Sequence, residues 1–184
     1  VFGFPGRTSQ YLTSKAVENY ISKLLPARIE MRKNSLRHID AAMAMDESTY
    51  IKYASKQSRI SNAYKKWIGQ ELGLRKKEAV NQKLSLEAEL VAVNSSYKKI
   101  LDDLIELESK KAKYELAYRL YIELWYYGPE MIRHSDGINK LKNSSEFEKT
   151  QQSKLEGLDD FFKNYDVDID KKIFKSLLPI YFKH

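Results

Sequence analysis

The sequence predicts an all-α protein, an irregular bundle of about seven or eight helices with a short extended N-terminal arm. Three observations lead to this prediction. Only 7 Gly and 4 Pro punctuate the 184 residues, apolar residues recur at three- and four-residue steps, and runs of alternating β-branched residues are absent. A chain of this length can bury roughly 70% of its unfolded surface in one domain.

Residues 1–13 are predicted to form the extended arm, and residues 14–184 the helical domain. Val1–Phe4 is short, apolar and strand-like, and Pro5-Gly6 suits the centre of a type II turn because Pro fixes φ and Gly allows a positive φ. The alternative interpretation of Gly3–Gly6 is the GxxG loop of a nucleic-acid-binding module. The flanking helices and sheet of that module are missing, so we expect no nucleic-acid site.

Caps and breakers divide the remaining chain into helices. Thr13 or Ser14 can cap the first helix, Pro26 breaks or kinks the chain before the second, and Asp46 can cap the third. The predicted helices are Lys15–Leu25, Ala27–Met45, Glu47–Gln70, Leu74–Val93, Tyr97–Tyr127, Glu130–Leu141, Glu146–Tyr165 and Asp170–Lys183.

Apolar positions predict which face of each helix is buried. The second helix has the stripe Ile29, Leu36, Ile39 and Met43, with Arg28, Arg32 and Arg37 elsewhere on its surface. In the fourth, Leu84, Ala88 and Val91 are expected to face inward. Within the longest periodic run, Lys110–Lys113 is expected to be either a break or a solvent-facing turn of helix. The run is expected to end in a core seam of aromatics: Tyr118, Tyr121, Trp125, Tyr126 and Tyr127.

Composition and motifs exclude several classes of function. The net charge is +7 with no Cys, so disulfides and thiolate metal sites are excluded. The cations are interspersed among 25 acids, which favours a solvated surface over a polyanion site. No apolar run reaches the ~20 residues of a membrane span. Asp166–Asp170 resembles a calcium loop but lacks its central Gly and distal Glu, so it is interpreted as a helix cap.

Catalytic chemistry is not evident in the sequence. His134-Ser135-Asp136 contains the residue types of a serine-hydrolase triad, but neighbours one and two steps apart on a helix do not face each other. The other histidines, His38 and His184, have no partners at metal-site spacing. We therefore expect no catalytic residue, metal or cofactor in this chain.

The stretch Tyr53–Gly69, YASKQSRISNAYKKWIG, is the most informative part of the chain. It predicts a helix with much aromatic surface and few acidic groups, which Gly69 and Gly73 are expected to stop. Asn62 lies in its middle, where asparagine is unfavourable unless its amide binds something.

Together with VFGFPGRTSQYLTS at Val1–Ser14, this stretch resembles the bacterial dipeptidyl-peptidases of the seven and eleven type, which are chymotrypsin-like serine exopeptidases. The resemblance is strong over Val1–Leu74 and weaker over Arg75–His184. It implies that the chain is the helical domain inserted into the double barrel of such an enzyme. The arm would then be the end of a barrel strand. The chain begins without Met, as expected of a piece cut from a longer protein.

The resemblance also implies roles for particular residues. The triad of the family lies in the barrel, and the helical domain covers the cleft, so that dipeptides are released. An Asn of this domain binds the substrate's N-terminus, and the matching residue is Asn62. Arg7, Lys65, Lys66 and Trp67 also match the motifs and are interpreted as structural, with Trp67 a core anchor and the lysines a solvated face.

The expected partners are a peptide N-terminus, the missing barrel and, through the apolar ends, a second copy in a homodimer. The resemblance implies a periplasmic or cell-surface location. The alternative hypothesis is a helical module without enzyme activity that binds a protein or a polyanion through its basic faces.

Overall fold

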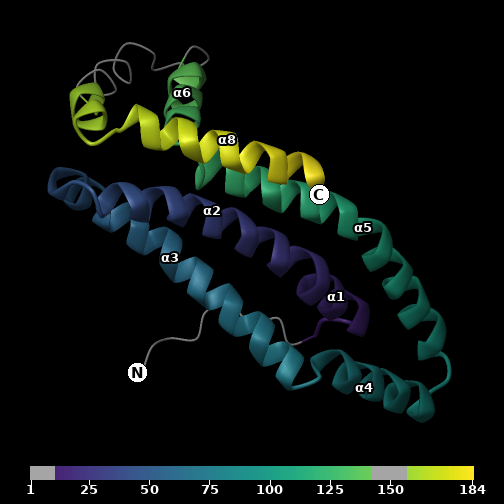
Figure 1. Cartoon of the computed structure of the whole chain (residues 1–184). Coiled ribbons are helices and arrows are strands. Elements are labelled where there is room, and N and C mark those ends of the chain that lie inside the picture. The colour runs from purple at the N-terminus through teal and green to yellow at the C-terminus, as the bar shows by residue number, and fades with distance from the viewer. Residues whose placement is uncertain (1–10, 142–156) are drawn as a thin grey trace.

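The computed structural model describes residues 11–141 and 157–184, and these residues form helices and connecting turns without a strand (Figure 1). The all-α prediction is confirmed. The helices are α1 (Ser14–Asn19), the π-helical turn η1 (Tyr20–Leu24), α2 (Leu25–Met43), α3 (Glu47–Lys76), α4 (Ala79–Val93), α5 (Tyr97–Tyr126), α6 (Glu130–Leu141) and α8 (Val167–Lys183). The arm over residues 1–10, with Arg7, lies outside the described residues, as does most of the predicted helix Glu146–Tyr165, of which residues 157–163 are helical.

The long helices pack side by side around α2 (Figure 1). The α2 helix packs against α3 on one side and against α5 and α8 on the other, while α1 contacts α4 and α5. In Figure 1, α4 lies at one end of the molecule and α6 at the other. In the described part of the chain, no helix is both long enough and apolar enough to cross a membrane.

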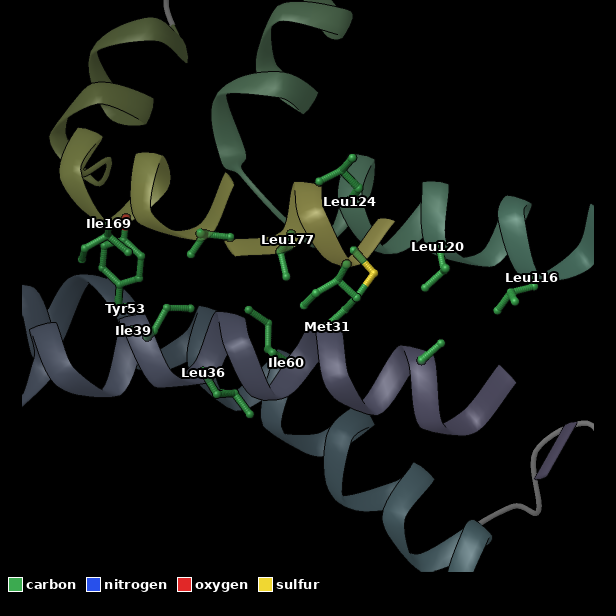
Figure 2. Packing of buried hydrophobic residues seen from close by; sticks show 13 residues of the cluster. Met31, Leu36, Ile39, Tyr53, Ile60, Leu116, Leu120, Leu124, Ile169 and Leu177 are labelled. Atoms are coloured by element: carbon green, nitrogen blue, oxygen red, sulfur yellow. The ribbon is translucent and has the colours of Figure 1, made fainter. Parts of the chain in front are cut away.

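The apolar core lies between α2, α3, α5 and α8 (Figure 2). From α2 it takes Met31, Leu36 and Ile39, and from α5 it takes Leu120 and Leu124. Figure 2 shows Tyr53 of α3 lying near Ile39 and Ile169 at one end of this core. Burial of these side chains removes apolar surface from water, and this is what holds four separate helices together. The other buried members are Ala27, Ile60, Leu116, Ile173, Leu177 and Ile180.

Three of the predicted helix starts have the expected caps. The side chain of Thr13 accepts from the backbone N–H of Ala16 at 3.2 Å, and that of Asp46 accepts from Thr49 at 2.7 Å. Asp166 accepts from Asp168 and Ile169 at 2.9 and 3.0 Å. The interpretation of the Asp166 region as a cap is thus confirmed, although α8 begins three residues earlier than predicted, at Val167.

Two predicted helix breaks are wrong. Pro26 does not end a helix, because it lies in the first turn of α2 and the chain enters α2 directly from the π-helical turn η1. Gly69 and Gly73 do not stop α3, which continues to Lys76. The chain turns instead at Glu78, which adopts the left-handed φ of 49°. For Lys110–Lys113 the second alternative is confirmed: it is a solvent-facing turn of helix within α5, with its three lysines exposed. Ion pairs one turn apart stabilise it.

Several predicted faces are also wrong. In α4 no residue is buried, and Leu84 and Ala88 are exposed. The expected aromatic core seam is largely at the surface: four of its tyrosines are exposed, namely Tyr118, Tyr121, Tyr126 and Tyr127. Conversely, Arg32 was expected on the surface of α2 and is 3% exposed. Helical periodicity identifies an apolar face but does not say whether this chain itself covers it.

His38 gives the fold a pH dependence. Its ring Nε2 has no hydrogen-bond partner in the described structure. Burial, with Arg37 and Lys172 nearby, lowers its pKa below the ordinary 6.5. The unfolded chain therefore takes up a proton more readily than the folded one. The free energy of unfolding should fall as pH drops through about 6.5 and level off below the lowered pKa.

Urea unfolding followed by circular dichroism between about pH 7.5 and pH 5.5 measures this slope. His38→Gln should flatten it, whereas the matched variant His184→Gln should keep it. Equal slopes in His38→Gln and the unsubstituted protein would show that this histidine does not cause the effect.

Candidate functional site

Two opposite faces of the α3 helix differ in burial. Tyr53, Ile60 and Trp67 lie on one face, seven residues apart, which is close to two helical turns, and all three are buried. Asn62 is two residues from Ile60, or about 200° around the axis, so it projects from the other face. The structure agrees, since Asn62 is exposed.

The Asn62 amide has no hydrogen-bond partner in the described part of the chain. Its oxygen and NH₂ group are both free to bind a ligand. An amide that only held a neighbouring helix would have a hydrogen-bond partner there, so this arrangement argues against a purely structural role for Asn62. The predicted role of Asn62 in substrate binding remains a hypothesis, and it requires the ligand to bind on the exposed face of α3.

The face around Asn62 is cationic. The α3 sequence contains no Asp or Glu between Glu47 and Glu71, but it contains five cations. Arg59 precedes Asn62 by three residues and Lys66 follows by four, so both are its neighbours on the helix surface. Lys65 and Lys66 are exposed, as predicted. A ligand at Asn62 is therefore approached in a positive field.

A buried ionic cluster holds the other face of α3. Glu123 of α5 is 1% exposed and accepts from Arg28 Nε at 3.1 Å and Nη2 at 2.8 Å, and also from Arg32 Nε. The Arg28 guanidinium lies 3.8 Å from the ring centroid of Trp67, and Arg32 lies 4.0 Å from that of Tyr127. We name these five residues the Glu123 cluster. It joins α2, α3 and the C-terminal end of α5, and it confirms Trp67 as a core anchor.

Most of this cluster was not predicted from the sequence. Arg28 and Arg32 are four residues apart on α2, and Glu123 is more than 90 residues distant. One available signal was the position of Glu123 directly before Leu124, on the apolar side of α5. A carboxylate at such a position needs a cationic partner if it is to be buried.

A second polar junction fixes α6 against α8. Buried Asp170 accepts from the backbone N–H groups of Glu130 and Met131 at 2.6 and 3.2 Å, which caps the start of α6, and from the Tyr165 hydroxyl at 3.1 Å. Burial, together with the charge of Asp170, raises the pKa of Tyr165 to about 12. Lys56 of α3 bonds Glu130 at 2.8 Å and the Asn164 carbonyl at 2.6 Å. This junction ties α3 to the α6–α8 end.

The histidines lie in structural settings. The His134 ring stacks on Phe161 with centroids 3.9 Å apart, and His184 Nε2 lies 3.4 Å from Glu30. His38 is partly buried on α2. Within residues 11–141 and 157–184, no group of three or more His, Asp or Glu side chains could hold a metal ion.

The described residues thus define an all-α domain with an exposed amide on a cation-rich helix. A model of the peptidase S46 family matches residues 1–184. The chain belongs to the peptidase S46 family, which confirms the resemblance predicted from the motifs.

Several curated relatives are dipeptidyl-peptidases. The chain is 28% identical to the Asp/Glu-specific dipeptidyl-peptidase of Flavobacterium psychrophilum and 31% identical to that of Capnocytophaga gingivalis, covering 98% of this chain and 27% of each relative. It is 32% identical to dipeptidyl-peptidase 7 of Porphyromonas gingivalis, covering 97% of this chain and 25% of that protein. The chain therefore spans about a quarter of the length of these relatives.

A solved structure has the same fold. The crystal structure of Porphyromonas endodontalis DPP11 in complex with the dipeptide Arg-Glu matches with a TM-score of 0.79 at 23% identity, covering 98% of this chain and 28% of that one. The match extends over almost the whole chain, so this chain shares the fold of the corresponding part of that structure.

Because the Glu123 cluster is buried, we expect a substitution of Glu123 to have a large effect on stability. Glu123→Gln removes the only negative charge of the cluster and leaves two guanidiniums in a largely buried site. Loss of one partner of a buried ion pair typically costs ~3–5 kcal/mol. We expect this decrease in the free energy of unfolding, measured by urea denaturation. Glu106→Gln breaks an exposed pair with Lys110 on the same helix and should leave the midpoint unchanged. Equal midpoints for the two variants would contradict the role assigned to Glu123.

Proposed function

We propose that this chain is the helical lid of a serine-type dipeptidyl-peptidase that removes dipeptides from the N-terminus of oligopeptides. The observation that carries the proposal is the exposed Asn62 amide, which has no partner in the described residues, on a domain that belongs to the S46 family. In this proposal residues 14–184 cover the active-site cleft, residues 1–13 continue a barrel strand, and the triad lies in the rest of the parent protein. Periplasmic or cell-surface location and homodimer formation are parts of the same proposal.

The chemistry of Asn62 suits a peptide N-terminus. Its amide oxygen can accept from an α-ammonium group while its NH₂ donates to a peptide carbonyl. A hydrogen bond to a charged partner is typically worth ~1.5–3 kcal/mol. The neighbouring cations Arg59 and Lys66 oppose an ammonium at this position, so the proposal needs carboxylates from the rest of the parent near the same point. Substrate binding is then shared between this domain and the barrel.

Asn62→Ala in the parent enzyme tests the proposal. Loss of the hydrogen bond should lower kcat/KM for peptides with a free N-terminus by roughly 10- to 100-fold. The free energy of unfolding should change by less than about 0.5 kcal/mol because the side chain is exposed. Asn81→Ala, which replaces another exposed asparagine, on α4, is the matched control and should leave kcat/KM unchanged.

The N-terminal amine can be tested separately with acetylated peptides. Acetylation removes the charge that the Asn62 oxygen is proposed to bind and leaves only the contact to the peptide carbonyl. Asn62→Ala should therefore lower kcat/KM for acetylated peptides by a smaller factor than for free-amine peptides. If kcat/KM for free-amine peptides is the same in Asn62→Ala as in the unsubstituted enzyme, Asn62 does not belong to the substrate site.

The cationic face of α3 favours one second candidate, a module that binds an acidic polymer. In that case binding of a polyanion such as heparin should weaken steeply as salt rises. Replacing Lys65 and Lys66 with Gln should weaken it further, whereas Asn62→Ala should have no effect. Binding that is absent, or that does not depend on salt, would exclude this candidate.

A further inference from the structure

A small pocket lies between α3, α6 and the turn that joins α5 to α6. Its volume is about 60 Å³, and Ile39, Ile60 and Ile173 form its apolar wall. Tyr126, Tyr127 and Gly128 line the side formed by the turn. Asn62 does not line this pocket, although Arg59, its neighbour on the surface of α3, does. The proposed substrate contact of Asn62 and the pocket therefore use different residues apart from the charge of Arg59.

Positive charge dominates the polar lining. Lys56, Arg59 and Arg133 face the single carboxylate of Glu130. Lys56 already bonds Glu130 and the Asn164 carbonyl. Arg59 has no hydrogen bond or ion pair in the described part of the chain, and Arg133 makes one long contact, 3.5 Å from Nη1 to the Tyr126 carbonyl. Two guanidiniums thus have unused donors at an apolar pocket.

A buried polar atom lies in the same place. Tyr53, which lines the pocket, is 2% exposed. Its hydroxyl lies near the Asp166 backbone N–H but forms no hydrogen bond of ordinary geometry in the described residues. Tyr53 thus adds a buried aromatic side chain to the pocket lining. The unused donors at the pocket are those of Arg59 and Arg133.

We propose that this pocket binds a carboxylate on a short apolar stem. Guanidinium groups bind carboxylates through two parallel hydrogen bonds, and the isoleucine wall suits one or two methylene groups. A pocket of about 60 Å³ holds only a few water-sized groups, which suits one carboxylate on a short stem. The carboxylate comes either from a free small acid or from an acidic side chain of another polypeptide segment.

The isoleucine wall supplies a direct test. The 184-residue chain, labelled with ¹³C at the isoleucine δ1 methyl groups, is titrated with propionate and followed by NMR. The methyl signals of Ile39, Ile60 and Ile173 should shift and saturate with a Kd on the order of 1 mM, as befits a ligand of so few atoms. Those of Ile21 and Ile100, which do not line the pocket, should not shift. Propionamide, which has the same shape without the charge, should shift none of these signals.

Charge-matched variants separate a defined site from the general positive field. Arg59→Gln and Arg133→Gln should each weaken propionate binding at least fivefold, whereas Arg37→Gln removes a cation elsewhere on the surface and should change it less than twofold. Circular dichroism checks that each variant remains folded. An equal loss in Arg37→Gln, equal binding of propionamide, or the absence of saturation would each overturn the proposal.

A blocked glutamate, N-acetyl-glutamate amide, distinguishes the two sources. It carries only the side-chain carboxylate. Binding as tight as that of propionate supports an acidic side chain as the natural occupant, and binding of propionate alone supports a free small acid. If neither shifts the three methyl signals, the pocket is not a carboxylate site. None of these outcomes depends on peptidase activity, so they do not bear on the role of Asn62.

Discussion

The position of α3 depends on one buried carboxylate. Glu123 lies at 1% exposure between Arg28 and Arg32, and these arginines in turn lie over the rings of Trp67 and Tyr127. Each of these charges would be costly to bury alone, but together they satisfy one another across three helices. Because Trp67 and Asn62 are on the same helix, fixing the ring inward fixes the amide outward. The part of the surface offered to a ligand is thus set by contacts on the opposite side of α3.

The packing is also incomplete at one end of the domain. The α4 helix has no buried residue, and on α5 the apolar side chains Ile100, Leu104 and Leu107 are exposed, whereas Leu116, Leu120 and Leu124 are buried. The chain spans about a quarter of the length of its curated relatives. In the proposed parent, these apolar surfaces are available for contact with the rest of the protein.

Much of the fold could be predicted from the sequence, because caps and periodicity are local. Asp46 and Asp166 cap the helices they were expected to cap, and the S46 family follows from two motifs. The wrong predictions have two different causes. Gly69 is helical because a glycine permits a turn without forcing one, whereas Arg32 is buried because Glu123, 91 residues away, pairs with it. The exposure of Asn62 follows from helical geometry once Trp67 is taken as buried. The pocket beside Tyr53 could not be predicted, since its lining comes from five helices and the turn between two of them.

A structure of the parent enzyme with a bound dipeptide tests most directly whether Asn62 binds the substrate. We expect the Asn62 amide oxygen within about 3 Å of the dipeptide ammonium, with Trp67, Arg28 and Glu123 arranged as they are in this domain. A dipeptide whose ammonium lies on another surface, with Asn62 facing solvent or packed against the barrel, would contradict it.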